Sequence, residues 1–183
     1  MFEVRLHGRG GQGAVTSAEL LALATINEGR YGQAFPSFGP ERRGAPVVAF
    51  FRSDDKQIKV RTEITNPDLV LVLDPSILRI VKVASGLKDD GILVANTKYT
   101  AQEIREELGL KCGIAVVNAT RIAFEELGIP VTNTTMLGAL LKAKPIVRPD
   151  SLIGPLQARF GRIAEKNINA FKRAMKETEL SFE

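Results

Sequence analysis

Four glycines lie within six positions near the start of the chain, in the stretch "HGRGGQGAV". The spacing Gly8-x-Gly10-x-x-Gly13 is typical of turns that lead a strand into a helix and bind dinucleotides. A helix start offers unpaired N–H groups and a partial positive charge, and glycines leave room for an anion such as a phosphate group. We interpret this turn as a candidate cofactor-binding site, with a tight turn without a ligand as the alternative. The candidate residues are Gly8, Gly10, Gly11, Gln12 and Gly13.

Two common nucleotide chemistries fit this turn poorly. A nicotinamide site also uses an acidic residue about 20 positions further on, which holds the ribose. Glu28 comes too early for that role, and Glu41 lies in a proline-flanked loop. The turn also lacks the GK[ST] ending of a P-loop, which disfavours nucleotide hydrolysis.

A second unusual segment, residues 34–46, carries three prolines, two phenylalanines and the pair Arg42–Arg43. Its prolines make it too stiff for a disordered linker. The phenylalanines either pack into the core or form an interface together with Arg42, since buried aromatics and arginine carry much of the energy of binding. We expect this loop to lie beside the glycine turn, at neighbouring strand ends, and we add Arg42 to the candidate ligand-binding residues.

Groups that perform catalysis are scarce. The only histidine, His7, stands at a strand end, and we interpret it as a partly buried structural residue rather than a general base. The only cysteine, Cys112, is interpreted as a small core residue; alone it forms no internal disulfide and cannot hold an iron–sulfur cluster or a structural zinc. We expect no catalytic residue, no metal site and no complete active site in this chain, so any metal belongs to a partner.

Composition narrows the class of protein. A length of 183 residues with 44% apolar and 25% charged residues predicts a single globular domain spanning residues 1–183. The net charge of +4 admits nucleic-acid binding, but basic and acidic residues are mixed, so we expect no nucleic-acid partner. The apolar runs are too short to cross a bilayer and the first residues do not resemble a signal peptide, which predicts a cytoplasmic protein without membrane contact.

The apolar pattern predicts the elements that position these residues. Short strands that are apolar on both faces alternate with helices from residue 67 onwards, as in a parallel sheet covered on both faces. We expect a three-layer α/β/α fold with a mainly parallel, Rossmann-like sheet, a β-hairpin and a helical C-terminus. The expected strands are 2–7, 68–74, 91–96 and 112–119, with a hairpin of 47–52 and 58–64.

Local signals set the expected helix ends. Thr16 and Glu19 have the spacing of a capping box for a helix that Gly29 ends, and Asn133 is expected to cap a helix that stops at Pro145. Further helices are expected at 76–87, 100–110 and 120–128. The last helix carries an apolar stripe that either packs on the chain's own sheet or forms a surface for another subunit. The stripe consists of Ala164, Ile168, Phe171 and Met175.

Four segments in order resemble the gamma subunits of 2-oxoacid:ferredoxin oxidoreductases, with the pyruvate enzyme as the nearest type. They are "GRGGQGAVTSAELLA" at 8–22, "SFGPERRGAPVVAFFR" at 37–52, "NPDLVLVLD" at 66–74 and "NTTMLGAL" at 133–140. The resemblance covers most of the chain. Its signature positions are Gly8, Gly10, Gly11, Gln12, Gly13, Phe38, Gly39, Glu41, Arg42 and Gly44.

This resemblance implies a subunit of a multi-chain enzyme that oxidatively decarboxylates a 2-oxo acid to its acyl-coenzyme A and reduces ferredoxin. It implies alpha-, beta- and delta-type partner subunits, which carry thiamine diphosphate and iron–sulfur clusters, and a gamma chain with no cluster of its own. Coenzyme A phosphates are the ligand expected at the glycine turn and Arg42. A free-standing nucleotide- or coenzyme-binding module stays open as the alternative, and the identity of the oxo acid and the direction of the reaction also stay open.

Overall fold

The computed structural model describes residues 1–37 and 43–182. Seven strands form one sheet in the order β2-β3-β1-β4-β5-β6-β7. β1, β4, β5 and β6 run parallel to one another, while β3 is antiparallel to β1 and to β2, and β7 is antiparallel to β6. The strands are β1 (Phe2–Arg9), β2 (Tyr31–Pro36), β3 (Pro46–Asp54), β4 (Leu69–Val72), β5 (Ile92–Asn96), β6 (Gly113–Val117) and β7 (Glu179–Ser181).

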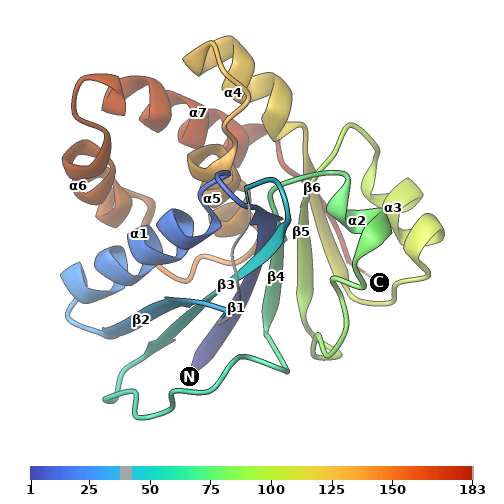
Figure 1. The fold of residues 1–183 in the computed structure, drawn as a ribbon, viewed down its shortest axis with the longest axis horizontal. Coiled ribbons are helices and arrows are strands. Elements are labelled where there is room, and N and C mark those ends of the chain that lie inside the picture. Colours follow the sequence, from blue (N-terminus) through green and yellow to red (C-terminus); the bar gives the residue numbers. More distant parts are fainter. Residues whose placement is uncertain (38–42, 183) are drawn as a thin grey trace.

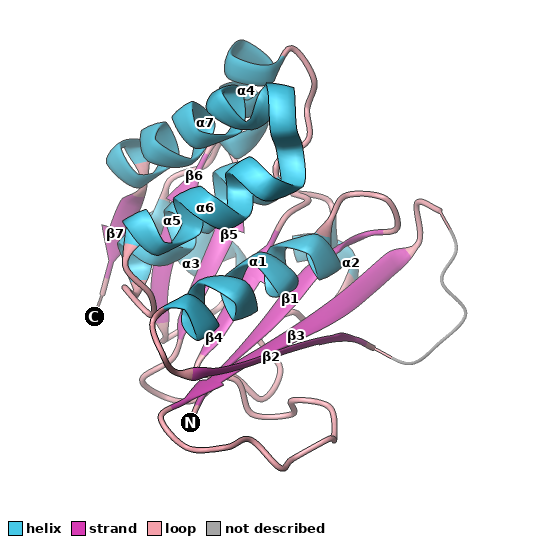
Figure 2. Ribbon diagram, turned by 90° about the vertical axis from the view of Figure 1, so that its left-hand side faces the viewer, coloured by secondary structure: helices cyan, strands magenta, loops and turns pink. Residues whose placement is uncertain are grey.

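Helices cover the sheet in two layers (Figures 1 and 2). One layer contains α1 (Ala14–Asn27), α4 (Ala119–Leu127), α5 (Asn133–Ala143), α6 (Pro149–Phe160) and α7 (Ala164–Glu177), with a short 3-10 turn at Gly161–Ile163. The other contains α2 (Ile77–Ile80) and α3 (Ala101–Leu108). The expected three-layer α/β/α fold with a mainly parallel sheet and a helical C-terminus is therefore confirmed.

Alternating residues of the central strands separate the two layers of the core. On β4, Leu69 and Leu71 pack in one buried cluster with α1, α5 and α7. Val70 and Val72 pack in a second cluster with α2 and α3. Successive strand residues point to opposite faces, so a strand covered on both sides must be apolar throughout.

The expected hairpin was wrong in one of its strands. β3 pairs with β2, which comes before it, and residues 58–64 form an irregular segment. Gly32 explains why β2 fits there, because a Cβ at this position would stand 2.6 Å from the main-chain oxygen of Ala22 on α1. The segment that we expected to pair with β3 is instead open to solvent at Val60, which is 41% exposed.

The helix expected at 76–87 is also mostly wrong. Only Ile77–Ile80 is helical, and Val81 is already extended. Gly86 has a φ of +74°, and a side chain there would clash with the carbonyl of Thr65. The segment after α2 therefore packs against the loop that contains Thr65 instead of continuing as a helix. Helical periodicity in the sequence does not reveal such a contact.

Two expected helix caps differ from those observed. Gly13, with φ +84°, stands at the N-cap of α1 and no side chain caps that helix, so Thr16 and Glu19 form no capping box. Thr132, rather than Asn133, is the N-cap of α5. A capping box does form at α3, where the Thr100 hydroxyl accepts from the N–H of Glu103 and the Glu103 carboxylate accepts from the N–H of Thr100.

The apolar stripe of the last helix packs inside the chain. Ala164 and Phe171 are buried, and Ile168 and Met175 pack partly buried against the core. α7 lies mainly against α5, which in turn contacts β5 and β6. The stripe is therefore internal, although it reaches the sheet through α5 rather than directly.

Candidate functional site

The glycine turn lies where the direction of winding changes. β1 and β4 are parallel neighbours, yet α1 follows β1 on one face of the sheet and α2 follows β4 on the other. The turn, residues 8–13, therefore meets Asp74 and Ser76 at the carboxyl ends of the two strands. In open α/β sheets this switch point is where ligands bind.

Two glycines of the turn adopt backbone conformations that favour glycine. Gly11 has φ +92° and Gly13 has φ +84°. A second reason requires glycine at position 13, because a Cβ there would lie 2.6 Å from Nδ2 of Asn133, the first residue of α5. At Gly8 the nearest atom would be 3.3 Å away, on Leu73, which is close but tolerable.

Gln12 fixes the shape of the turn. Its Oε1 accepts a hydrogen bond from the backbone N–H of Arg9 at 2.8 Å, and its Nε2 donates to Oδ2 of Asp74 at 2.6 Å. Burial alone would raise the pKa of Asp74, but hydrogen bonds from Ser76 and Gln12, with the charge of Arg9, lower it below its ordinary value. Asp74 is therefore ionised at neutral pH and holds Gln12 firmly.

Arg9 joins the turn to two further segments. Its guanidinium donates to Oγ of Ser76 at 2.7 Å and to the carbonyl of Gly44 at 2.9 Å, and its Nε lies 3.5 Å from the Asp74 carboxylate. Gly10 bonds the same stretch through its backbone, since its N–H donates to Ala45 and its carbonyl accepts from Gly44. The expected closeness of the 34–46 loop to the turn is confirmed for residues 43–45. Arg42, with Phe38, Gly39 and Glu41, lies outside the described residues.

The start of α1 is open to an anion. No side chain caps it and its first turn holds no acidic residue. Within the described part of the chain, the N–H groups of Gly11, Gly13 and Ala14 have no main-chain or side-chain acceptor. Uncapped N–H groups together with the helix dipole bind negative charge.

Asn133 is a residue of this site that the sequence did not reveal. It is 4% exposed, its side chain packs against Gly13, and its backbone carbonyl accepts from Oγ of Ser17 on α1 at 3.3 Å. Its Oδ1 is buried and has no hydrogen-bond partner in the described part of the chain. The start of α5 thus lies against the start of α1, which places two helix N-termini at one crevice.

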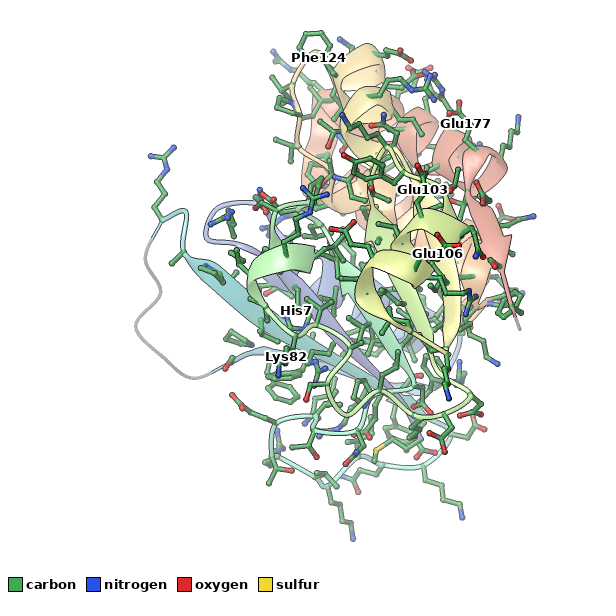
Figure 3. The ribbon with its side chains drawn as sticks, turned by 90° about the vertical axis from the view of Figure 1, so that its right-hand side faces the viewer. His7, Lys82, Glu103, Glu106, Phe124 and Glu177 are labelled. Atoms are coloured by element: carbon green, nitrogen blue, oxygen red, sulfur yellow. The ribbon has the colours of Figure 1, made fainter. Side chains whose placement is uncertain are left out.

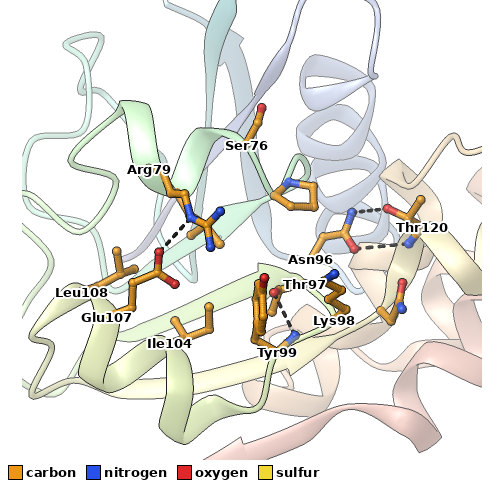
Figure 4. Close-up of a pocket in the computed structure, with 13 residues that line it drawn as sticks. Ser76, Arg79, Asn96, Thr97, Lys98, Tyr99, Ile104, Glu107, Leu108 and Thr120 are labelled. Atoms are coloured by element: carbon orange, nitrogen blue, oxygen red, sulfur yellow. Dashed lines mark hydrogen bonds and ion pairs between the residues drawn. The ribbon is translucent and has the colours of Figure 1, made fainter.

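A cavity of about 470 Å³ adjoins the turn beyond Ser76 (Figure 4). Arg79 closes one side through an ion pair with Glu107 at 2.8 Å. On the other side Asn96 donates to Thr120 Oγ1 at 2.9 Å and accepts from its N–H at 3.2 Å. The cavity extends the crevice along the carboxyl ends of β4, β5 and β6, with cationic and hydroxyl groups in its lining.

The sole histidine stands directly before the turn, and the sole cysteine lies elsewhere in the fold. His7 is 6% exposed, and burial, followed by the charge of Arg5, lowers its pKa to about 4. The interpretation of His7 as a buried residue is therefore confirmed. Cys112 is half-buried just before β6.

Within residues 1–37 and 43–182, no group of three or more His, Cys, Asp or Glu side chains is arranged to hold a metal ion. None of the described helices has the length and apolar character needed to span a membrane.

Fold and site together define a doubly wound α/β protein with an anion-ready crevice at its switch point. The chain belongs to the Pyruvate ferredoxin/flavodoxin oxidoreductase family, which matches residues 3–177. The expected family is therefore confirmed.

Relatives of similar length support this assignment. The chain is 52% identical over 180 residues to the pyruvate/ketoisovalerate oxidoreductases common subunit gamma of Thermococcus kodakarensis, with 97% of each chain covered. It is 49% identical over 180 residues to pyruvate synthase subunit PorC of Methanothermobacter thermautotrophicus, with 98% of this chain and 97% of that one covered. The crystal structure of pyruvate oxidoreductase subunit PORC from Thermotoga maritima has a TM-score of 0.89 at 37% identity, covering 98% of both chains.

Proposed function

We propose that this chain is the gamma subunit of a multi-chain 2-oxoacid:ferredoxin oxidoreductase, with pyruvate as the preferred substrate. In this role residues 1–183 form a single gamma-type domain of a cytoplasmic enzyme that converts the oxo acid to its acyl-coenzyme A and reduces ferredoxin. The observation that carries this proposal is the 52% identity to a common subunit gamma over nearly the whole of both chains.

The redox chemistry belongs to partner subunits in this proposal. An iron–sulfur cluster needs several thiolate ligands, and this chain has a single cysteine. Thiamine diphosphate and the clusters are therefore assigned to the alpha-, beta- and delta-type chains, which also pass electrons to ferredoxin. This chain contributes an ordered crevice rather than a reacting group.

Coenzyme A is the ligand proposed for that crevice. Its phosphates would receive hydrogen bonds from the open N–H groups of Gly11, Gly13 and Ala14. Gly8 and Gly10 bring the backbone close, and Gln12 holds the turn through Asp74. Among the described residues that hold the turn, Asp74 carries a negative charge, and the Arg9 guanidinium offsets it at 3.5 Å. Arg42 stays part of the proposal on the family resemblance alone.

A free-standing coenzyme-binding module is the alternative function. It is favoured by one observation, because an open helix start at a switch point also occurs in modules that bind nucleotides without partner chains. Such a module would bind coenzyme A by itself and would purify alone.

Co-expression with genes for alpha-, beta- and delta-type subunits separates the two functions. A tagged gamma subunit is expected to retain alpha-, beta- and delta-type chains through gel filtration, and the complex is expected to reduce ferredoxin only with an oxo acid and coenzyme A. The preparation without this chain is the control. A tagged chain that elutes alone and binds coenzyme A would support the module instead.

A further inference from the structure

A second polar site lies on the face of β1 and β3 that α1 does not cover. The site is a groove of about 400 Å³, which we call the β1–β3 groove. Its floor contains the cross-strand pairs His7–Val48 and Arg5–Phe50. Residues 63–65 form one wall, and Lys82, after α2, belongs to the other. Figure 3 shows His7 and Lys82 on this side of the molecule.

His7 brings an unsatisfied donor to the groove. Nε of Arg5 donates to Nε2 of His7 at 3.1 Å, so Nε2 carries the lone pair. With a pKa of about 4 the ring is neutral at pH 7, and its proton therefore sits on Nδ1. Among the described residues Nδ1 has no acceptor, and it does not belong to the fully buried polar atoms that lack a partner, so it is accessible from the groove. An acceptor from outside the chain would satisfy it.

The charges of the groove favour an anionic acceptor. Arg5 uses Nη2 on the carbonyls of Val83 and Ser85, at 2.8 and 2.5 Å, which leaves Nη1 without a partner in the described part of the chain. Lys82 is exposed and, in that same part of the chain, has no ion-pair partner. Glu63 is the acidic residue in the lining, and Ser37 Oγ donates to its carboxylate. Among the described residues of the lining, two cations therefore face one anion.

The shape of the groove favours a protein segment over a small molecule. Sites for small molecules enclose most of the ligand surface, whereas this groove is an open depression on a sheet face, bordered by residues 63–65 and by the segment after α2. Val48 is half-buried and gives the floor an apolar spot beside the cations, whereas Phe50 and Ile64 are each only 3% exposed. An occupant therefore needs a carboxylate and an adjacent apolar group.

We propose that the β1–β3 groove docks an acidic segment of a partner subunit, whose Asp or Glu carboxylate binds His7 Nδ1 and Lys82. An apolar neighbour of that residue packs on Val48. This inference rests on the proposed function, because a free-standing module has no partner subunit to dock.

Carbodiimide coupling of the assembled complex tests the docking directly. The reagent activates a carboxylate, the Lys82 amine attacks it, an amide bond forms and the reagent leaves as a urea. Mass spectrometry is expected to find Lys82 joined to an Asp or Glu of a partner subunit. Lys82→Arg keeps the charge but is not coupled, so it is expected to assemble normally and to lose this cross-link.

Charge reversal gives the matched measurement of affinity. Lys82→Glu is expected to weaken assembly with the purified partner subunits at least tenfold, whereas Lys172→Glu, an exposed change on α7, is expected to leave it unchanged. Equal assembly of the two variants, or coupling of Lys82 only to carboxylates of its own chain, overturns the proposal. The proposal is also overturned if acetate, titrated into the isolated full chain, shifts the NMR signal of the His7 ring but Lys82→Glu assembles normally with the partner subunits. If the wild-type chain does not bind the partner subunits, the proposed function is refuted as well. The assembly of the wild-type chain therefore distinguishes failure of the proposed function from failure of the docking proposal.

Discussion

Gln12 and Asp74 are joined side chain to side chain across the switch point, although 62 positions separate them in the sequence. The Gln12 amide donates to the Asp74 carboxylate at 2.6 Å while its oxygen accepts from the N–H of Arg9 at 2.8 Å. One uncharged side chain therefore links the end of β1 to the residue beyond β4. The conformation of the glycine turn depends on this link.

Replacing Gln12 by Glu is expected to destabilise the protein. The change removes the donor to Asp74 and places a second carboxylate beside it, which costs about 1–3 kcal/mol in free energy of unfolding. Urea denaturation at pH 7 measures this loss. Gln157→Glu, at an exposed position of α6, makes the same chemical change and is expected to alter stability by less than about 0.5 kcal/mol. Equal effects of the two changes would show that the link contributes nothing.

Alanine at Gly13 is expected to cost more than alanine at Gly29. Both residues have positive φ, +84° and +77°, so each substitution loses about 1–2 kcal/mol from backbone strain. Nothing lies within 4 Å of a Cβ at Gly29, whereas at Gly13 it would meet Asn133 at 2.6 Å, which adds roughly 1–3 kcal/mol. Denaturation of both variants measures the difference.

Truncating the neighbour tests the cause of that difference. Asn133→Ala removes Nδ2 and Cγ, the two atoms nearest to the added methyl group. In that background the further cost of Gly13→Ala is expected to fall towards the cost at Gly29. If the further cost does not change, packing against Asn133 is not the reason that position 13 is a glycine.

His7 is expected to make stability depend on pH between about 6.5 and 4. Burial and Arg5 lower its pKa in the folded protein to about 4, so in this range the unfolded chain binds a proton that the folded chain does not. Stability therefore falls as pH falls through this window, by up to about 1.4 kcal/mol per pH unit. Below it the two states are equally protonated and this contribution stays constant.

His7→Gln isolates this contribution, because glutamine keeps an acceptor for Arg5 but does not titrate. Between pH 6.5 and 5 few carboxylates change protonation, so unfolding free energies measured there report mainly on the histidine. Wild type is expected to lose about 2 kcal/mol over this interval and the variant less than half of that. Parallel pH profiles would show that His7 is not buried in its neutral form.

The sequence predicted the central sheet because burial on both faces leaves a local signal. The runs that became β4, β5 and β6 are apolar throughout, as strands covered by helices on both sides must be. The prediction of the hairpin failed because the choice of β2 as the partner of β3 depends on contacts between residues distant in the sequence. Gly32 belongs in β2 because α1 approaches it closely, a reason that strand propensity cannot show.

The candidate site was predictable only in part for a similar reason. Glycine spacing located the turn and the open helix start, both of which are local features. Asp74 and Asn133 join the site through strand order and helix packing, and only the folded chain shows these. The position of Asp74 directly after an apolar strand was the available signal for it. Asn133 was predicted to be a helix cap, and no local sequence pattern indicates that it packs against Gly13.

A charge placed at the start of α1 tests the proposed coenzyme A contact most directly. Thr16 lies in the first turn of this helix, beside Arg159 of α6, and Thr16→Glu adds a negative charge near the helix start at which the phosphates are proposed to bind. An acidic residue there suits the helix dipole, so the fold is expected to be as stable or slightly more stable. In the reconstituted complex the KM for coenzyme A is expected to rise at least tenfold for Thr16→Glu, with an unchanged KM for the oxo acid, and to stay near wild type for Thr16→Gln. An assembled Thr16→Glu complex with wild-type KM for coenzyme A would contradict the account.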